Sequence, residues 1–466
     1  MEAYREYVIC DTLLGQSATR GERTLMDNSL PSQQAALDHS PRDICVIGLG
    51  YVGLPIAAEF DRVGHDVVGY DIDADKISQL TAGVDPTGDV GDERVDDSSI
   101  EFTTDETAIE RAEYVIVTVP TPVDDLKNPN LTFVETAGET IGRNITPGTT
   151  VVLESTVYPG ATEEILGPAI ERTSGLTAGE EFVLAYSPER LVPGDEENGF
   201  RDVIKIVSAQ TDDVLDDLAA LYESVVDAGV HRAPSIEVAE AAKCVENIQR
   251  DLNIALVNEL AITCNTLGID THAVLDAAST KWNFHDYRPG LVGGHCIPVD
   301  PFYIIYESER NGFSPKLVQQ ARETNERMPT HVARETLKAL SDCGNVLGEA
   351  RVLVLGLAYK PNVGDIRTSA VDGTIEELEA YGVEVVGYDP HADSEAAREE
   401  FGIPIQEELD FDGVDCLLLA TPHDEFRRID FTAAAAEMST NPLLVDVMGV
   451  LNEERYADSE LTYRRI

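Results

Sequence analysis

A short apolar run that ends in a glycine-rich turn constrains the fold more than any other part of this sequence. Residues 44–47 read Ile-Cys-Val-Ile, and residues 48–53 continue as Gly-Leu-Gly-Tyr-Val-Gly before a helical pattern begins. In this G-x-G-x-x-G pattern the glycines allow a tight turn, the approach of a pyrophosphate, and close packing of helix on sheet. Asp71 ends the next apolar run, where a carboxylate that binds an adenosine ribose is expected. The segment therefore predicts a dinucleotide site that favours NAD over NADP; an ordinary glycine-rich turn is the alternative.

Strand-like and helical patterns alternate on both sides of a long helical stretch. Apolar runs recur, separated by helical patterns, at 67–70, 114–117, 149–153, 182–185 and 204–208, and again at 351–355, 383–388, 416–420 and 443–447. Such alternation predicts parallel sheets with helices on both faces. Between the two halves, residues 237–265 contain no Gly or Pro and have apolar residues at helical spacing, which predicts one long, largely buried helix. A second helix is predicted over 315–340.

The two α/β halves resemble each other. The sequence Val-Ile-Gly-Leu-Gly at 46–50 returns as Val-Leu-Gly-Leu-Ala at 354–358, and Val-Gly-Tyr-Asp occurs at 68–71 and at 386–389. The repeat indicates duplicated nucleotide-binding domains. The second turn has Ala358 in place of a glycine, so we expect it to hold a different nucleotide, that of the substrate.

These patterns predict an α/β protein with two Rossmann-like, doubly wound domains joined by a helical central domain. The expected divisions are a disordered or poorly ordered extension at 1–40, an NAD-binding domain at 41–232, a central helical domain at 233–340, and a second Rossmann-like, nucleotide-binding domain at 341–466.

Charge and composition exclude several classes of function. The chain has 86 acidic and 34 basic residues, a net charge of −52, which disfavours binding to nucleic acid or to an anionic membrane. Only 8 of the basic residues are lysines, and this balance favours a halophilic protein working in concentrated salt. No apolar segment is long enough for a membrane span or a signal peptide, so we expect a cytoplasmic protein. The seven cysteines show no zinc-like spacing, so no metal site is predicted.

The segment from Arg288 to Pro301 carries the candidate chemistry. Gly293 and Gly294 let a ligand approach the backbone, Cys296 follows, and Asp300 lies four residues later. A thiol in a glycine-rich turn beside an acid is a candidate nucleophile, although a lone cysteine is more often an inert core residue.

Several motifs together resemble the UDP-glucose/GDP-mannose dehydrogenase family. They lie at 48–55, 119–122, 154–157, 187–190, 239–259, 293–296 and 356–367, and the resemblance covers about residues 43–455. It implies an NAD-dependent enzyme that oxidises the C6 alcohol of a nucleotide sugar twice to give a uronate, and a homodimer built around the long helix.

The resemblance also implies roles for individual residues. Cys296 would form a thiohemiacetal and then a thioester with the sugar, Lys243 would stabilise oxyanions, and Asn247 would hold a water or a substrate oxygen. Asp300 would help to activate water. The implied catalytic residues are Cys296, Lys243, Asp300, Asn247, Glu189 and Thr156. The implied cofactor residues are Gly48, Gly50, Tyr51, Val52, Gly53, Asp71, Pro120, Thr121, Thr156 and Arg367. The implied substrate residues are Glu189, Arg190, Leu191, Lys243, Asn247, Arg288, Gly293, Gly294, Tyr359 and Lys360. His295 and Cys244 are interpreted as structural neighbours.

Two departures from the UDP-glucose pattern bear on the substrate. The pocket segment Ser-Pro-Glu-Arg at 187–190 lacks the family's second carboxylate, and the helix carries Arg250-Asp251-Leu-Asn253. The helix segment, together with Lys-Trp-Asn-Phe at 281–284 and Arg-Pro-Gly at 288–290, resembles the branch that acts on UDP-N-acetylhexosamines, with UDP-N-acetyl-D-mannosamine as the first expectation. The gluco and galacto epimers and UDP-glucose stay open as alternatives. A non-catalytic sensor and a two-electron 3-hydroxyacid dehydrogenase are the other classes considered; the presence of Cys296, Lys243 and Asp300 argues against a sensor.

Overall fold

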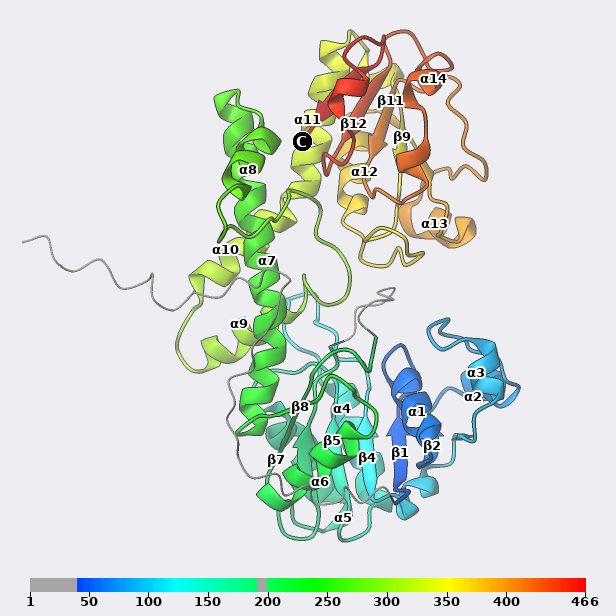
Figure 1. Cartoon of the computed structure of the whole chain (residues 1–466), viewed down its shortest axis with the longest axis vertical. Coiled ribbons are helices and arrows are strands. Elements are labelled where there is room, and N and C mark those ends of the chain that lie inside the picture. The colour runs from blue at the N-terminus through cyan, green and yellow to red at the C-terminus, as the bar shows by residue number, and fades with distance from the viewer. Residues whose placement is uncertain (1–39, 191–198) are drawn as a thin grey trace, which may run out of the picture.

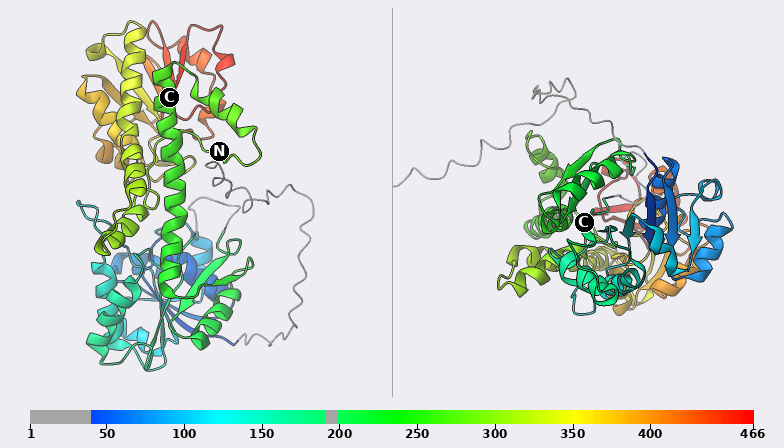
Figure 2. Two further views of the ribbon diagram at one scale, coloured as in Figure 1. Left: turned by 90° about the vertical axis from the view of Figure 1, so that its left-hand side faces the viewer. Right: turned by 90° about the horizontal axis from the view of Figure 1, so that it is seen from below.

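A computed structural model describes residues 40–190 and 199–466. The extension predicted over 1–40 falls, apart from its last residue, outside the described residues, and so does Leu191. The described chain forms two α/β lobes connected by one helix, α7 (Ile236–Leu267), which runs from the first lobe to the second (Figures 1 and 2). At 32 residues, α7 is about 48 Å long. Within the two described ranges, no helix is both long and apolar enough to span a membrane.

The first lobe is an eight-stranded sheet covered by helices on both faces. Its strand order is β3-β2-β1-β4-β5-β6-β7-β8. The strands are β1 (Asp43–Ile47), β2 (Asp66–Tyr70), β3 (Glu101–Thr103), β4 (Tyr114–Val117), β5 (Thr150–Leu153), β6 (Val183–Tyr186), β7 (Lys205–Ala209) and β8 (Val230–Arg232). The helices are α1 (Gly53–Arg62), α2 (Ala74–Thr81), α3 (Asp92–Asp96), α4 (Thr132–Asn144), α5 (Gly167–Ser174) and α6 (Asp212–Glu223), with the short helices η1 (Glu106–Arg111) and η2 (Thr162–Leu166). The central strands β4 and β5 are buried along their whole length, which explains why they are continuous apolar runs.

The second lobe repeats this architecture at smaller size. Its five strands are all parallel, in the order β10-β9-β11-β12-β13. The strands are β9 (Arg351–Leu355), β10 (Glu384–Tyr388), β11 (Cys416–Leu419), β12 (Leu443–Asp446) and β13 (Thr462–Arg465). The helices are α12 (Val371–Ala380), α13 (Ser394–Phe401) and α14 (Phe431–Ala435), with the short helices η3 (Leu347–Glu349), η4 (Phe426–Arg428) and η5 (Glu453–Arg455).

Four further helices follow α7 in the chain. They are α8 (Thr271–Ser279), α9 (Asp300–Arg310), α10 (Lys316–Glu326) and α11 (Met328–Asp342). Arg322 of α10 forms a buried ion pair with Asp251 of α7, with 2.5 Å between Nη1 and Oδ1, and Asn325 donates to the same carboxylate. These bonds fix α10 against the middle of α7.

The predicted α/β fold is confirmed, and backbone hydrogen bonds show how closely the two lobes match. The N–H of Gly48 donates to the carbonyl of Tyr70, and the N–H of Gly356 donates to that of Tyr388, each at 2.9 Å. Both glycines have positive φ, +89° and +84°, which a residue with a side chain rarely adopts.

Some sequence-based expectations need correction. Strand β7 pairs antiparallel with β6, so the first sheet is mixed, and the edge strands β3, β8 and β13 were not anticipated. The helix predicted over 315–340 is two helices that meet at Arg327, because Pro329 has no N–H to continue the first. Helix α7 has the predicted extent, but it is not largely buried: Leu256 and Leu260 are exposed.

Candidate active site

The glycine turn after β1 leaves space for a ligand. A Cβ on Gly53 would lie 1.9 Å from the carbonyl oxygen of Gly48, so this position must be glycine for α1 to pack on the turn. A Cβ on Gly50 would meet no protein atom within 4 Å. Helix α1 begins here, and its N-cap residue Val52 makes no side-chain cap. The N–H of Leu54 donates to the carbonyl of Gly50 at 3.1 Å, so the space suited to a pyrophosphate is the open side of the turn at Gly50, before α1.

Asp71 closes the same turn. Its Oδ2 accepts hydrogen bonds from the N–H of Leu49 at 2.8 Å and from Nζ of Lys76 at 2.7 Å, and its Oδ1 accepts from the N–H of Asp73 at 2.9 Å. Burial alone would raise the pKa of Asp71, but these donors, Lys76 first, lower it, so the group is a carboxylate. Lys76 is not among the residues predicted from the sequence. Its position in the first turn of the helix that follows Asp71 could have indicated a partner for this carboxylate.

Cys296 is an accessible thiol. Its side chain is exposed, whereas Cys45, Cys244, Cys264 and Cys416 are buried and Cys343 is half-buried. The surrounding protein still raises the pKa of Cys296, the charge of Asp300 raises it further, and the charge of Lys243 acts in the opposite direction. Cys244 packs inside the lobe, with its thiol 3.5 Å from the carbonyl oxygen of Val157, as expected for a structural residue.

A buried acid lies under this thiol. The N–H of Asp300, the first residue of α9, donates to the carbonyl of Cys296 at 2.8 Å. Its carboxylate Oδ2 accepts from Nδ2 of Asn247 on α7 at 2.6 Å. Burial raises the pKa of Asp300 to about 6, against the effects of the Lys243 charge and the Asn247 hydrogen bond. The structure therefore brings together four of the residues that the sequence assigned to catalysis: Cys296, Asp300, Lys243 and Asn247.

Glu189, which belongs to the first lobe, lies in the neighbourhood of Cys296. Its charge raises the pKa of Cys296, so the carboxylate lies within electrostatic range of the thiol. Its Oε1 accepts from the N–H of Arg190 at 2.6 Å, and its Oε2 lies 3.5 Å from Nζ of the buried Lys205. Lys205 also pairs with Glu154, and neither residue had been assigned a role from the sequence.

The second lobe closes over the cysteine loop. The ring of Tyr359 packs on Gly294, where a Cβ would lie 2.8 Å from the ring and φ is +88°. A Cβ on Gly293 would lie 2.8 Å from the carbonyl oxygen of Thr368. Both glycines are thus required by close contact with the second lobe.

A second contact joins the second lobe to the glycine turn of the first lobe. The guanidinium of Arg367 lies 5.3 Å from the ring centroid of Tyr51, in the glycine turn of the first lobe. Asp365 holds that guanidinium through Nε at 2.9 Å and Nη2 at 2.8 Å, and lies 3.6 Å from Nε2 of His295. His295 therefore points toward the second lobe, consistent with a structural neighbour.

The remaining predicted residues lie in different surroundings. Near the cofactor turn, the carbonyl of Thr121, which follows Pro120, accepts a hydrogen bond from the Tyr303 hydroxyl of α9, and Thr156 is half-buried. Nζ of Lys360 lies 5.8 Å from the centroid of the Tyr359 ring. Two arginines have protein partners instead: Arg190 pairs with Glu246 at 2.7 Å, and Arg288 pairs with Asp276 at 2.7 Å and with Asp286 at 2.9 Å.

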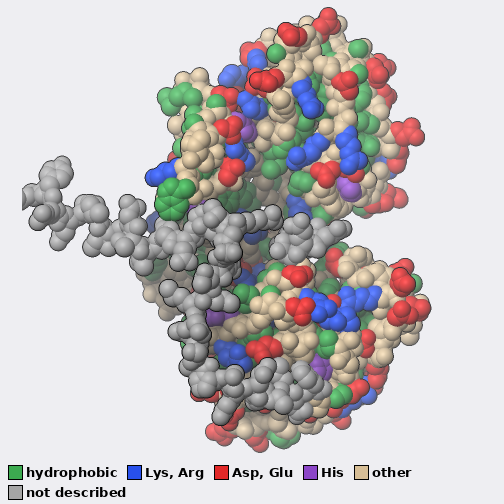
Figure 3. Space-filling view, in the orientation of Figure 1, with side chains coloured by type: hydrophobic (Ala, Val, Ile, Leu, Met, Phe, Trp, Pro, Cys, Tyr) green, Lys and Arg blue, Asp and Glu red, His purple; other side chains and the backbone are tan. Residues whose placement is uncertain are grey.

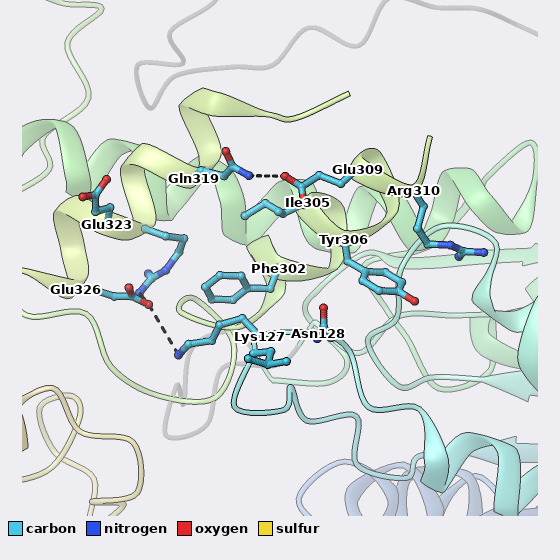
Figure 4. Close-up of a pocket in the computed structure, with 12 residues that line it drawn as sticks. Lys127, Asn128, Phe302, Ile305, Tyr306, Glu309, Arg310, Gln319, Glu323 and Glu326 are labelled. Atoms are coloured by element: carbon cyan, nitrogen blue, oxygen red, sulfur yellow. Dashed lines mark hydrogen bonds and ion pairs between the residues drawn. The ribbon is translucent and has the colours of Figure 1, made fainter. Parts of the chain in front are cut away.

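A separate cavity of about 410 Å³ lies between the loop at 126–128 and helices α9 and α10 (Figure 4). Phe302 and Tyr306 line it beside charged side chains. Lys127 pairs with Glu326 at 3.9 Å, and the other two cations lining it pair with carboxylates as well. This pairing gives the cavity little attraction for an anionic nucleotide, which favours the surroundings of Cys296 as the candidate active site.

We expect two glycine variants to separate turn packing from NAD binding. Gly53→Ala should lower both the melting temperature and the NAD affinity, because its Cβ overlaps the Gly48 carbonyl. Gly50→Ala should keep the melting temperature and weaken NAD binding about tenfold or more, because its methyl group enters only the ligand space. Calorimetry of NAD binding and thermal unfolding measure the two effects. A Gly50→Ala protein that binds NAD like the wild type would contradict the assigned cradle.

We expect the charges around Cys296 to control its alkylation by iodoacetamide at pH 8. Because Lys243 lowers the thiol pKa, Lys243→Met should raise that pKa and slow the reaction several-fold. Because Asp300 raises the pKa, Asp300→Asn should lower it and speed the reaction. Peptide mass spectrometry gives the rates, with the half-buried Cys343 as internal control. Equal rates in all three proteins would refute this electrostatic assignment.

Comparison with known proteins identifies the family. Three consecutive segments match domains of the UDP-glucose/GDP-mannose dehydrogenase family: its NAD binding domain at 42–226, its central domain at 237–327 and its UDP binding domain at 353–453. Protein CapL of Staphylococcus aureus is 43% identical over 91% of this chain and 99% of its own length. A UDP-N-acetyl-D-glucosamine 6-dehydrogenase of Pseudomonas aeruginosa is 42% identical over 88% and 98%.

A solved structure agrees with these matches. A UDP-D-ManNAc dehydrogenase from Pyrococcus horikoshii has a TM-score of 0.82 and 30% identity, covering 91% of this chain and 98% of its own. The open cradle at Gly50 and the carboxylate of Asp71 fit the cofactor that the family's first domain binds. The chain belongs to the UDP-glucose/GDP-mannose dehydrogenase family, whose members are NAD-dependent oxidoreductases of nucleotide sugars.

Proposed function

We propose that this protein oxidises the C6 alcohol of a UDP-N-acetylhexosamine to the uronate through covalent intermediates on Cys296. The overall reaction consumes the alcohol, two NAD⁺ and one water, and gives the carboxylate, two NADH and three protons. The observation that carries the proposal is the exposed Cys296 thiol, with Lys243 and Asp300 beside it, in a loop that the second lobe contacts.

Each residue of this group has a chemical task. The Cys296 thiol adds to the C6 aldehyde, and the thiohemiacetal is later oxidised to a thioester. The ammonium of Lys243, buried on α7, stabilises the oxyanion at C6, because few waters screen its charge there. Asn247 orients Asp300 through the 2.6 Å hydrogen bond, and Asp300 takes a proton in its carboxylate form, which predominates above about pH 6.

Cofactor and substrate would approach the thiol from opposite lobes. Gly50, the N-terminus of α1 and Asp71 would hold NAD, which when bound supplies the acceptor for the hydride removed from C6. Tyr359 and Lys360 of the second lobe would face the nucleotide of the substrate. In keeping with this, we assign cofactor binding to 41–232, catalysis and dimerisation to 233–340 and UDP-sugar binding to 341–466.

The hexosamine epimer is tested best with a panel of substrates. The sequence pattern places UDP-N-acetyl-D-mannosamine first. The similarity to a relative named for UDP-N-acetyl-D-glucosamine is greater, at 42% identity against 30% for the solved mannosamine enzyme. Both sugars therefore belong in the panel, with UDP-glucose as the competing candidate.

The exposed face of α7 supports a homodimer. Five large apolar side chains on this helix are exposed although they share one face; we name them the α7 stripe: Val238, Val245, Leu256, Leu260 and Leu267. Their spacings of seven, eleven, four and seven residues are close to whole helical turns. An apolar stripe of this length needs a partner surface, and a second copy of α7 provides a matching one.

The acidic surface supports function in concentrated salt. Acidic side chains are spread over both lobes on the face shown in Figure 3. At a net charge of −52, self-repulsion opposes folding unless salt screens it, and the screening length falls to about 3 Å at 1 M. We propose a halophilic protein, and its assays belong in molar KCl.

The assay that tests this function measures NADH in several molar KCl with UDP-N-acetylglucosamine, UDP-N-acetylmannosamine and UDP-glucose. We expect two NADH per sugar oxidised from the preferred substrate. Cys296→Ser should form no uronate, because no thioester can arise, while Cys343→Ser should behave like the wild type. Absorbance at 340 nm and mass spectrometry of the product provide the measurements. Absence of NADH with every UDP-sugar, or uronate formation by Cys296→Ser, would refute the proposal.

The α7 stripe predicts the effect of a charge at its centre. Leu256→Asp should convert the dimer to a monomer in light scattering at high salt, because the carboxylate would be buried against the partner helix. Leu317→Asp changes an even more exposed leucine on α10, outside the stripe, and should leave the dimer intact. A monomeric wild-type protein would exclude the dimer.

A further inference from the structure

A buried ion network lies directly behind Glu189. Lys205 of β7 is 4% exposed, and its Nζ lies 2.5 Å from Oε2 of Glu154 and 3.5 Å from Oε2 of Glu189. The hydroxyl of Tyr222 donates to the other oxygen of Glu154. Nζ of Lys205 also lies 5.4 Å from the ring centroids of Tyr222 and Phe200. One ammonium is thus shared between two carboxylates in the interior of the first lobe.

The charges of this network are unbalanced by one. Two carboxylates and one ammonium sum to −1, and a buried excess charge is costly. Burial alone would lower the pKa of Lys205, but Glu154 and Glu189 raise it, so the ammonium stays charged. When either carboxylate takes up a proton, the sum becomes zero. The network is therefore suited to accept one proton.

The network lies next to the candidate active site. Glu154, which follows β5, is held near Glu189 because Lys205 contacts both carboxylates. Because Glu189 lies within electrostatic range of the Cys296 thiol, whose pKa it raises, the network extends to the reacting group.

We propose that Lys205 is a positioning residue for thioester hydrolysis, because its contact with Oε2 of Glu189, at 3.5 Å from Nζ, fixes the carboxylate that takes a proton from the attacking water. This inference rests on the proposed function. Water adds to the acyl carbon, one of its protons goes to Glu189, and the bond between carbon and sulfur breaks. The Cys296 thiolate recovers that proton from Glu189, and the product carboxylic acid releases its own proton to solvent and leaves as the uronate.

A purely structural role for Lys205 predicts something different. If the ion pair only ties β7 to β5, its loss should lower stability and slow every step alike. If Lys205 positions Glu189, its loss should slow hydrolysis selectively, after both oxidations have taken place. The two roles therefore differ in the step that becomes rate-limiting.

The test measures NADH release by stopped flow at saturating NAD and UDP-N-acetylhexosamine. For Lys205→Met we expect a burst of two NADH per active site, followed by a steady-state rate at least about tenfold below wild type. The acyl enzyme should accumulate on Cys296 and be visible by intact-protein mass spectrometry. Lys205→Arg keeps the charge and should recover most of the steady-state rate.

Two further variants keep the test decisive. Tyr222→Phe retains the buried ring and removes only the donor to Glu154, so it should show a smaller burst of the same kind even if Lys205→Met folds poorly. Arg322→Met removes the buried ion pair between α10 and Asp251 of α7, which is separate from the Lys205 network. This variant should lower stability without producing a burst of NADH. Uniform slowing without acyl enzyme in both Lys205→Met and Tyr222→Phe would overturn this inference alone. A wild-type enzyme that releases no NADH would overturn the proposed function as well.

Discussion

A carboxylate buried close to the Cys296 thiol is the constraint on which the rest of the candidate site depends. Asp300 begins α9 and has its backbone N–H bonded to Cys296, so the acid and the thiol cannot separate. An isolated carboxylate at this depth would be destabilising, and Asn247 and Lys243, one turn apart on α7, compensate it. The same contacts fix α9 against α7, so the stability of the central helices and the chemistry of the cysteine loop rest on one set of bonds.

The second lobe completes this site through contacts that only glycine permits. Tyr359 can lie on Gly294 because no Cβ intervenes, and Arg367 of the same lobe reaches Tyr51 in the glycine turn of the first. The second lobe is therefore in direct side-chain contact with both the cysteine loop and the glycine turn of the first lobe. A nucleotide sugar held by the second lobe would have its far end presented to the thiol, which suits an enzyme that reacts at C6.

Features that depend on local sequence could be predicted, and features that depend on pairing across the fold could not. The glycine turns, the buried strands and the extent of α7 follow from short patterns. The edge strands β3 and β8 have three residues each, too few to show a pattern, and the antiparallel direction of β7 depends on how the chain returns to the sheet. Cys296 and Asp300 are four residues apart, whereas Lys205 reaches Glu154 across 51 positions, so only the structure brings them together.

The two lobes show how one architecture is adapted to two ligands. In both, a carboxylate at the end of the second strand of the repeat accepts the N–H that follows the first glycine: Asp71 from Leu49 and Asp389 from Leu357. In the second lobe Asp389 also bonds the buried His423, 3.0 Å away, and the loop bearing His423 packs on the glycine turn. The acid of the second turn is thus paired with a buried histidine of its own lobe, whereas Asp71 of the first turn is paired with Lys76. Because Tyr359 of the second lobe contacts Gly294 beside Cys296, we expect a substrate nucleotide to bind on that side of the lobe, with its sugar toward the thiol.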